Sequence, residues 1–238
     1  MKLNKSSKTN RKLLAIIPAR QGSKRLPNKN IIKLAGRPLL YYVITALKKS
    51  RIPTKILVSS DSDEILKVAK KYGVSISKRP KYLATDKALS TDVVRYEIKK
   101  LKNEHFDYVM LCQPTSPLLS PRTIRLAFKK MIAKRYDCLF SITKVKMHPR
   151  YYRTVRPNGT LSQFLNLKTK SNQSFYQHNG AIYLYRTDFL LRSKSWFPFS
   201  KRNSGYIEMS WAESIDIDTL DDLTLAETII RGKLHERN

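Results

Sequence analysis

Basic and small residues crowd a short stretch that directly follows an apolar run near the N-terminus. Residues 13–17 have the length and composition of a buried strand, and Pro18 ends it. A loop of small residues leaves backbone N–H groups open to an anion, and Arg or Lys beside them can neutralise a polyphosphate. The candidate residues are Arg20, Gly22, Ser23, Lys24, Arg25, Asn28, Lys29 and Asn30. The sequence therefore predicts an anion-holding loop, and a solvated basic loop is the alternative.

This loop differs from the two common phosphate motifs. It is not a Walker A motif, because it lacks the Gly-Lys-Ser/Thr ending. It is not a dinucleotide fingerprint either, because that motif needs three glycines and the loop has only Gly22. The pattern therefore indicates a phosphate site of another class.

Two carboxylates alternate with apolar residues in Ser214-Ile-Asp-Ile-Asp218. On a strand, alternate residues point the same way, so Asp216 and Asp218 would face a site while the isoleucines face the core. Two carboxylates, substrate phosphate oxygens and water suit octahedral Mg²⁺. The alternative is a pair of acids that cap the following helix. On this short pattern alone the helix cap is the favoured alternative, although the chain has only 18 acidic residues, which makes a paired set more notable.

An amide and two hydroxyls follow another apolar run, residues 106–112, in Gln113-Pro-Thr-Ser-Pro117. The two prolines predict a rigid turn. Gln113, Thr115 and Ser116 suit a polyhydroxylated ligand, although the two hydroxyls could equally satisfy the backbone of the turn itself.

Alternating strands and helices position these residues. Such an alternation predicts a parallel sheet with a nucleotide site at the carboxyl ends of its strands. Expected strands cover residues 13–17, 55–60, 106–112, 138–143, 179–185 and 214–219. Expected helices cover residues 38–49, 61–72, 94–101, 124–132 and 220–230.

Residues 144–178 break the alternation with a polar, basic and aromatic stretch. A structureless loop of this length is improbable inside a compact domain, so a projecting hairpin arm is expected. We expect residues 1–11 to be a disordered basic lead-in. The α/β domain would then comprise residues 12–143 and 179–238, with the arm at 144–178.

Composition limits the possible classes of protein. The 238 residues are 41% hydrophobic, enough for a core, and no apolar run approaches the ~20 residues of a membrane span. Cys112 and Cys138 give neither a disulfide framework nor metal-ligand spacing, which favours a reducing, cytoplasmic setting. The net charge of +29 argues for a polyanionic partner, with nucleic acid as the default. Non-specific polyanion binding is therefore a second hypothesis.

The stretch from Ala15 to Asn30 resembles the signature of the sugar-activating cytidylyltransferases, in particular the CMP-sialic acid synthetases (N-acylneuraminate cytidylyltransferases). Four further stretches fit in the same order: Val58-Ser-Ser-Asp61, Leu111-Cys-Gln-Pro-Thr-Ser-Pro117, Asn179-Gly-Ala-Ile-Tyr183 and Ser214-Ile-Asp-Ile-Asp218. The resemblance covers roughly residues 13 to 232.

This resemblance implies an α/β, Rossmann-like nucleotide-diphospho-sugar transferase fold. Its mostly parallel sheet would be flanked by helices, and the projecting arm would pack on a second subunit of a homodimer. The implied reaction is CTP plus a nine-carbon acidic sugar giving CMP-sugar plus pyrophosphate, with Mg²⁺ as cofactor. N-acetylneuraminate is the leading sugar, with legionaminic and pseudaminic acids close behind. The alternatives are a Kdo cytidylyltransferase, or a basic nucleic-acid-binding module that keeps the fold without turnover.

The resemblance also implies roles for individual residues. Lys29, Arg20 and Asp216 would be catalytic, and Asp216 and Asp218 would hold the metal. The implied substrate-binding residues are Arg20, Gly22, Ser23, Lys24 and Lys29 at the triphosphate, Asn30 and Arg79 at the nucleotide, Ser90 near the cytosine, Gln113, Thr115 and Ser116 at the sugar, and Asn179.

The match departs from the family pattern mainly at the sugar end. Arg25 stands where many sialate enzymes have Gly. Met147-His148-Pro149 replaces His-His-Pro, and Gln177 replaces an Arg. These changes leave the identity of the sugar open. His148 and His178 lack a partner pattern for acid–base catalysis and are expected to be surface or packing residues.

Overall fold

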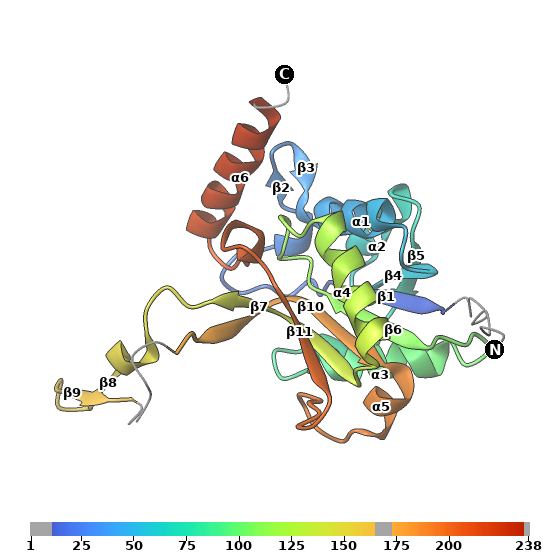
Figure 1. Ribbon diagram of the computed structural model, residues 1–238. Coiled ribbons are helices and arrows are strands. Elements are labelled where there is room, and N and C mark those ends of the chain that lie inside the picture. The colour runs from blue at the N-terminus through green and yellow to red at the C-terminus, as the bar shows by residue number, and fades with distance from the viewer. Residues whose placement is uncertain (1–10, 165–172, 236–238) are drawn as a thin grey trace.

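A twisted sheet forms the centre of the molecule (Figure 1). The computed structural model describes residues 11–164 and 173–235. Within these ranges seven strands form the sheet, in the order β11-β7-β10-β6-β1-β4-β5. Their bounds are β1 (Leu13–Pro18), β4 (Lys55–Ser60), β5 (Ser75–Lys78), β6 (Tyr108–Cys112), β7 (Cys138–Lys144), β10 (Tyr176–Arg186) and β11 (Ser204–Glu208). The expected strand positions are thus confirmed up to residue 185.

Most strand pairs are parallel, as predicted. The pairs β1–β4, β1–β6, β4–β5 and β11–β7 run parallel, whereas β10 runs antiparallel to both β6 and β7. β1 is buried along its whole length, as a central strand covered on both faces must be.

Helices cover both faces of the sheet. The longer helices are α1 (Leu39–Ser50), α2 (Asp63–Lys71), α3 (Ser90–Lys100), α4 (Pro121–Lys134), α5 (Thr187–Arg192) and α6 (Leu220–His235). The apolar sides of α1, α2 and α4 share a core with Leu13, Ala15 and Ile17 of β1. Leu14 and Ile16 point the other way and pack with residues of α3 and α5. The alternation along β1 therefore separates two apolar layers.

A third apolar cluster forms where α6 meets the loop after β1. Leu26, Ile215 and Ile217 pack there with residues of α6. The prediction that residues 214–219 form a strand is wrong: a short helix, η4 (Ala212–Ser214), is followed by extended chain outside the sheet. Ile217 N donates to Thr115 O at 2.9 Å, which fixes this chain beside the turn after β6.

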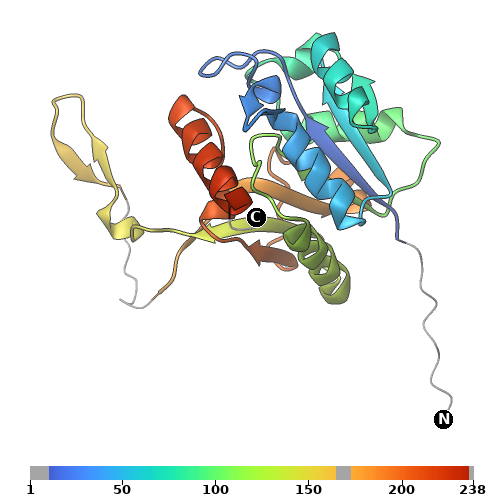
Figure 2. The same cartoon turned by 90° about the horizontal axis from the view of Figure 1, so that it is seen from above.

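A two-stranded hairpin projects from the body of the molecule (Figures 1 and 2). It comprises β8 (Arg153–Val155) and β9 (Leu161–Gln163), and the short helix η3 (Pro149–Tyr151) precedes it. β7 runs to Lys144 and β10 begins at Tyr176, so both strands extend into the predicted arm. Of that arm, residues 165–172 lie outside the described residues, as does the predicted lead-in except Arg11.

The remaining short elements lie around the carboxyl end of β1. They are η1 (Lys29–Ile31), β2 (Lys33–Leu34), β3 (Arg37–Pro38) and η2 (Lys81–Ala84). No helix in the described part of the chain is both long and apolar enough to cross a membrane.

Candidate functional site

A cavity of about 490 Å³ opens at the carboxyl ends of the parallel strands. The predicted site residues that line it are Arg20, Ser23, Lys24, Lys29, Asn30, Arg79, Ser90, Gln113, Thr115 and Asp218. They come from the loops after β1, β5 and β6, from the first residue of α3 and from the chain before α6. Parallel strands bring these loops to one edge of the sheet, as the element order predicted.

Hydrogen bonds hold the loop after β1 against the neighbouring strand. Gln21 N donates to Asp61 Oδ1 at 3.1 Å, just beyond the end of β4. The buried Asn30 donates from Nδ2 to Arg20 O at 2.8 Å, which ties the two ends of the loop together. Asn28 adopts a left-handed conformation, with φ of 54°, and lets the chain enter η1. The loop therefore has a defined shape.

Two carboxylates pair with the four cations of this loop. Asp86 Oδ1 lies 2.6 Å from Arg20 Nη1, and its Oδ2 lies 2.6 Å from Lys24 Nζ. Asp218 lies 2.7 Å from Arg25 Nη2 and 2.8 Å from Lys29 Nζ. The cations are thus gathered in one place, each facing an anionic group.

The two predicted metal ligands have opposite pKa shifts. Burial raises the pKa of Asp216, the negative charge of Asp218 adds to this, and a hydrogen bond with Thr115 opposes it. Burial would also raise the pKa of Asp218, but hydrogen bonds and attraction from Lys29 and Arg25 outweigh it and lower that pKa. Asp216 as a residue is exposed, so its carboxyl group stays accessible to a ligand from solvent.

The donor set of this pair fits Mg²⁺. Within the described residues, no cluster of three or more His, Cys, Asp or Glu side chains forms a complete metal cage. Mg²⁺ usually takes one or two carboxylates and completes its shell with water and substrate phosphates, so two acids beside a cavity lined by cations are sufficient. The raised pKa of Asp216 means that its ionised form is disfavoured, and a bound cation would stabilise that form.

Arg79 is a buried cation in the cavity wall, only 4% exposed. Burial lowers its pKa; Asp61 raises it, Arg20 lowers it and the buried Glu97 raises it. Within the described structure its Nε has no hydrogen-bond partner. Arg79 therefore places a buried positive charge in the cavity wall, and its Nε–H group can still donate a hydrogen bond to a ligand.

A smaller cavity of about 160 Å³ adjoins the first and shares Ser90 and Gln113 with it. Gln113 Nε2 donates to Ser90 Oγ at 3.3 Å, on the boundary between the two. Its walls are mainly aromatic and apolar: Leu89, Leu111, Tyr183, Tyr185, Trp196 and Phe197. One end of the site is thus cationic and the other apolar.

Four predicted site residues do not line the larger cavity. Asp216 lies beside it through Thr115, and Gly22 is exposed on the loop. Ser116 is buried in the turn, where its carbonyl accepts from Leu119 N. Asn179 is buried and hydrogen-bonds to Ser141 and Ser214.

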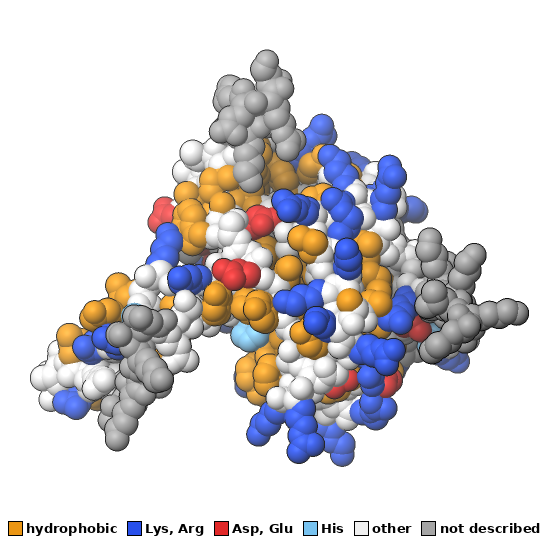
Figure 3. All heavy atoms as spheres, in the orientation of Figure 1, with side chains coloured by type: hydrophobic (Ala, Val, Ile, Leu, Met, Phe, Trp, Pro, Cys, Tyr) orange, Lys and Arg blue, Asp and Glu red, His pale blue; other side chains and the backbone are white. Residues whose placement is uncertain are grey.

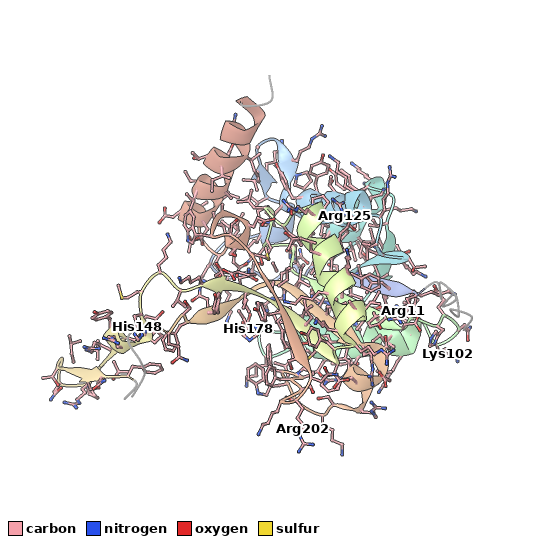
Figure 4. The ribbon with its side chains drawn as sticks, viewed as in Figure 1. Arg11, Lys102, Arg125, His148, His178 and Arg202 are labelled. Carbon is pink, nitrogen blue, oxygen red and sulfur yellow. The ribbon has the colours of Figure 1, made fainter. Side chains whose placement is uncertain are left out.

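The two histidines come from separate places (Figure 4). His148 lies on the arm against Phe175, and His178 packs edge-on against Phe140 and Phe197. Burial lowers the pKa of His178. These contacts agree with the prediction that both are surface or packing residues.

Sequence reasoning missed Asp86, which contacts two of the loop cations. It falls in residues 74–92, which showed no clear periodicity. A signal was present, since Asp86 is an acid in an acid-poor chain and lies between two predicted nucleotide-binding residues, Arg79 and Ser90.

Comparisons with known proteins agree with this geometry. The family model described as Cytidylyltransferase matches residues 14–230. The CMP-N,N'-diacetyllegionaminic acid synthase of Legionella pneumophila is 37% identical over 231 residues, covering 92% of this chain and 96% of that protein. The pseudaminic acid cytidylyltransferase of Campylobacter jejuni is 34% identical over 231 residues, covering 92% and 97%. The N-acylneuraminate cytidylyltransferase of Escherichia coli is 34% identical over 230 residues, covering 95% of this chain but 54% of that protein.

Solved structures share the fold. The structure of CMP:2-keto-3-deoxy-manno-octonic acid synthetase complexed with CTP superposes with a TM-score of 0.73 at 18% identity, covering 93% of this chain and 99% of that one. A 4-diphosphocytidyl-2C-methyl-D-erythritol synthase from Anaerococcus prevotii gives a TM-score of 0.64 at 13% identity, covering 93% and 97%. The predicted mostly parallel α/β fold flanked by helices is confirmed.

Proposed function

The chain belongs to the cytidylyltransferase family, and from this premise we propose that it transfers CMP from CTP to an acidic nine-carbon sugar, with release of pyrophosphate. It is a nucleotidyltransferase of the N-acylneuraminate cytidylyltransferase type. One observation carries the proposal: a single cavity combines the cationic loop, the buried Arg79, Asp218 and the amide of Gln113.

Attack of the sugar's anomeric hydroxyl on the α-phosphorus needs positioning and charge neutralisation more than covalent help. Arg20, Lys24 and Lys29 supply positive charge around the phosphates, and Ser23 supplies a hydroxyl. Asn30 fixes the loop by its hydrogen bond to Arg20 O, so it acts as a positioning residue. Arg25, which also contacts Asp218, adds a further cation at the same place.

Mg²⁺ is the cofactor that this site fits, with Asp216 and Asp218 as its protein ligands. When bound, it would neutralise charge on the leaving pyrophosphate. Asp218 would then exchange its contacts with Arg25 and Lys29 for the metal, which frees both cations for phosphate.

We assign the sugar to the Gln113 end of the site. Its amide suits a sugar hydroxyl, and the adjoining aromatic cavity suits an apolar substituent such as an acyl methyl group. The names of three relatives concern diacetyllegionaminic acid, N-acylneuraminate and pseudaminic acid, and this chain's own choice among them stays open. The eight-carbon Kdo remains the alternative within the class.

We further propose that the arm pairs two copies of the chain in the cytoplasm. Five large apolar side chains on it are at least half exposed: Met147, Tyr151, Val155, Leu161 and Phe164. A hairpin without a core of its own is marginal in water, so a second copy is a reasonable cover for it. Cys112 and Cys138 are free and buried, which fits a reducing compartment.

The decisive experiment measures pyrophosphate release from CTP and Mg²⁺ with N-acetylneuraminate, legionaminate, pseudaminate and Kdo. We expect release with one nine-carbon sugar, and a loss of at least about 100-fold in Asp216→Asn and Asp218→Asn. Asp221→Asn, an exposed acid in the first turn of α6, is the matched control and should keep its activity. Normal turnover of both variants would overturn the metal assignment.

A basic binding module is the second candidate, favoured by the face that α1 and α4 form. The two helices lie side by side, and their sequences carry seven Lys or Arg but no Asp or Glu. Figure 3 shows Lys and Arg side chains spread over the visible surface, with few acidic ones among them. DNA retention that survives in Asp216→Asn and falls steeply with salt, without turnover of any sugar by the parent protein, would favour this candidate.

A further inference from the structure

Asp86 reaches across the site from a loop that carries none of the predicted phosphate ligands. It lies between η2 and α3, yet its two oxygens contact Arg20 and Lys24, each at 2.6 Å. These are two of the cations assigned above to the triphosphate. Side-chain exposures of 35% for Arg20, 82% for Lys24 and 45% for Asp86 leave all three groups accessible to a ligand from solvent.

A carboxylate that bridges two cations uses the same donors as a phosphate group. A carboxylate and a phosphate both present two anionic oxygens to an Arg or Lys. A phosphate that binds Arg20 and Lys24 must therefore replace Asp86 or bind against its negative charge. Both outcomes weaken binding, relative to a site without that carboxylate.

The empty site has a physical reason to hold such an anion. Arg20 lies close enough to the buried Arg79 to lower the pKa of Arg79. Arg20, Lys24 and Arg79 all line the same cavity, where positive groups repel one another. Asp86 compensates part of this repulsion in the absence of substrate.

We propose that Asp86 is a displaceable counter-ion of the phosphate loop, which holds Arg20 and Lys24 in the empty site and competes with the phosphates of CTP and pyrophosphate. The inference rests on the proposed function. Its consequence is kinetic: a competing carboxylate promotes departure of pyrophosphate after CMP transfer, at a cost in affinity for CTP.

Asp218 bridges Arg25 and Lys29 in a similar way, but it is also assigned to the metal. Asp86 has no such second role, so its removal tests competition alone. Asp86→Asn removes the charge and keeps the shape, and Asp86→Glu keeps the charge. Asp63→Asn is the matched control, since Asp63 forms an exposed ion pair with Lys78 at 2.6 Å and does not line the cavity.

The first measurement is the affinity for inorganic pyrophosphate, by titration calorimetry without sugar or added metal. We expect Asp86→Asn to bind about three- to tenfold more tightly than the parent, as the loss of two competing exposed ion pairs would give. Asp86→Glu and Asp63→Asn should bind like the parent. The difference should shrink as salt is raised.

The second measurement is steady-state turnover of the same four proteins. Asp86→Asn should lower KM for CTP and strengthen inhibition by pyrophosphate, each by a similar factor. Unchanged or weaker pyrophosphate binding in Asp86→Asn would overturn the inference, and weaker binding would mean that Asp86 orients Arg20 for phosphate instead.

The outcomes for the function and for Asp86 are separable. A parent protein that binds pyrophosphate but uses no sugar would refute the proposed function, and the ratio of pyrophosphate affinities would still decide the role of Asp86. A parent protein that does not bind pyrophosphate would overturn the role of Asp86, and pyrophosphate release from CTP with sugar and Mg²⁺ would still decide the function.

Discussion

Asn179 illustrates how a residue in a functional motif can act through the fold. Its Oδ1 accepts from Ser141 Oγ at 2.5 Å and from Ala181 N at 3.3 Å, and its Nδ2 donates to Ser214 Oγ at 2.8 Å. Ser214 stands two residues before Asp216. Asn179 therefore ties the chain that carries both carboxylates to strands β7 and β10.

We expect Asn179→Ala to lower the free energy of unfolding by about 1–3 kcal/mol, because it removes the hydrogen bonds of a buried amide to Ser141, Ala181 and Ser214. Urea denaturation measures this. Asn158→Ala is the control: Asn158 accepts from Thr160, in the exposed turn of the β8–β9 hairpin, so its substitution should lower the free energy of unfolding less. A variant of Asn179 with normal stability but lost CTP binding would instead support the predicted contact with substrate.

Residues were predictable where their signal was local. The cations of the loop after β1 and the amide of Gln113 could be predicted because each directly follows an apolar strand. The contact of Asp86 with Arg20 could not be predicted. It depends on the course of the chain through η2, and no periodicity in the sequence indicates that course. The contacts of Asp218 with Arg25 and Lys29, which compete with its role as a metal ligand, also could not be predicted, because sequence spacing does not determine these distances.

At the scale of elements, apolar periodicity identified helices α1 to α4 and α6 and five of the seven strands of the central sheet, but it missed the short strands β5 and β11. It failed at residues 214–219, where Ile215 and Ile217 alternate as on a strand. These side chains pack beneath α6 rather than within the sheet, and alternation alone cannot tell the two environments apart. The start of α6 is capped instead by Thr219 and Asp222, which hydrogen-bond reciprocally.

The hairpin of the arm gives a prediction at this scale. Val155 and Leu161 are register partners, 72% and 64% exposed. We expect Val155→Ser with Leu161→Ser to convert a dimer into a monomer, because the exposed apolar pair loses the surface that a second copy would cover. Light scattering coupled to size-exclusion chromatography measures the mass.

Leu126→Ser is the control for this change. Leu126 is an exposed leucine of α4, 44% accessible and on another part of the molecule, so its substitution should leave the mass unchanged. A dimer that survives the double change in the arm would show that the hairpin does not form the interface.

For the whole molecule, the order of strands was only partly predictable. The βαβ alternation predicts β1, β4 and β6 as parallel neighbours. The insertion of β10 between β6 and β7, against the direction of both, follows from the return of the chain out of the arm. The break in the alternation of strands and helices shows where in the sequence an antiparallel strand can join the sheet, but it does not predict the direction of that strand.

The net charge of +29 also acts on the whole molecule. Mutual repulsion of cations destabilises a compact chain, and salt screens it. We expect the Tm to rise by about 3–6 °C between 50 and 500 mM NaCl, which corresponds to roughly 1–2 kcal/mol. Differential scanning fluorimetry measures it.

Lys129→Glu, on the acid-free face of α1 and α4, should raise the Tm at low salt and reduce its rise with NaCl. A Tm that does not respond to salt would mean that the excess charge costs the fold little.

The two cysteines have a practical consequence. Cys112 on β6 pairs across from Ile182, and Cys138 on β7 pairs across from Tyr185, so the two thiols flank β10 from opposite sides. Both are fully buried, and burial raises the pKa of each. A thiol in that state reacts with an alkylating reagent only after the surrounding strands separate. The alkylation rates of the two thiols therefore report how the sheet opens. Equal rates for Cys112 and Cys138 would mean that the sheet opens as one unit, and unequal rates would reveal which side of β10 opens first.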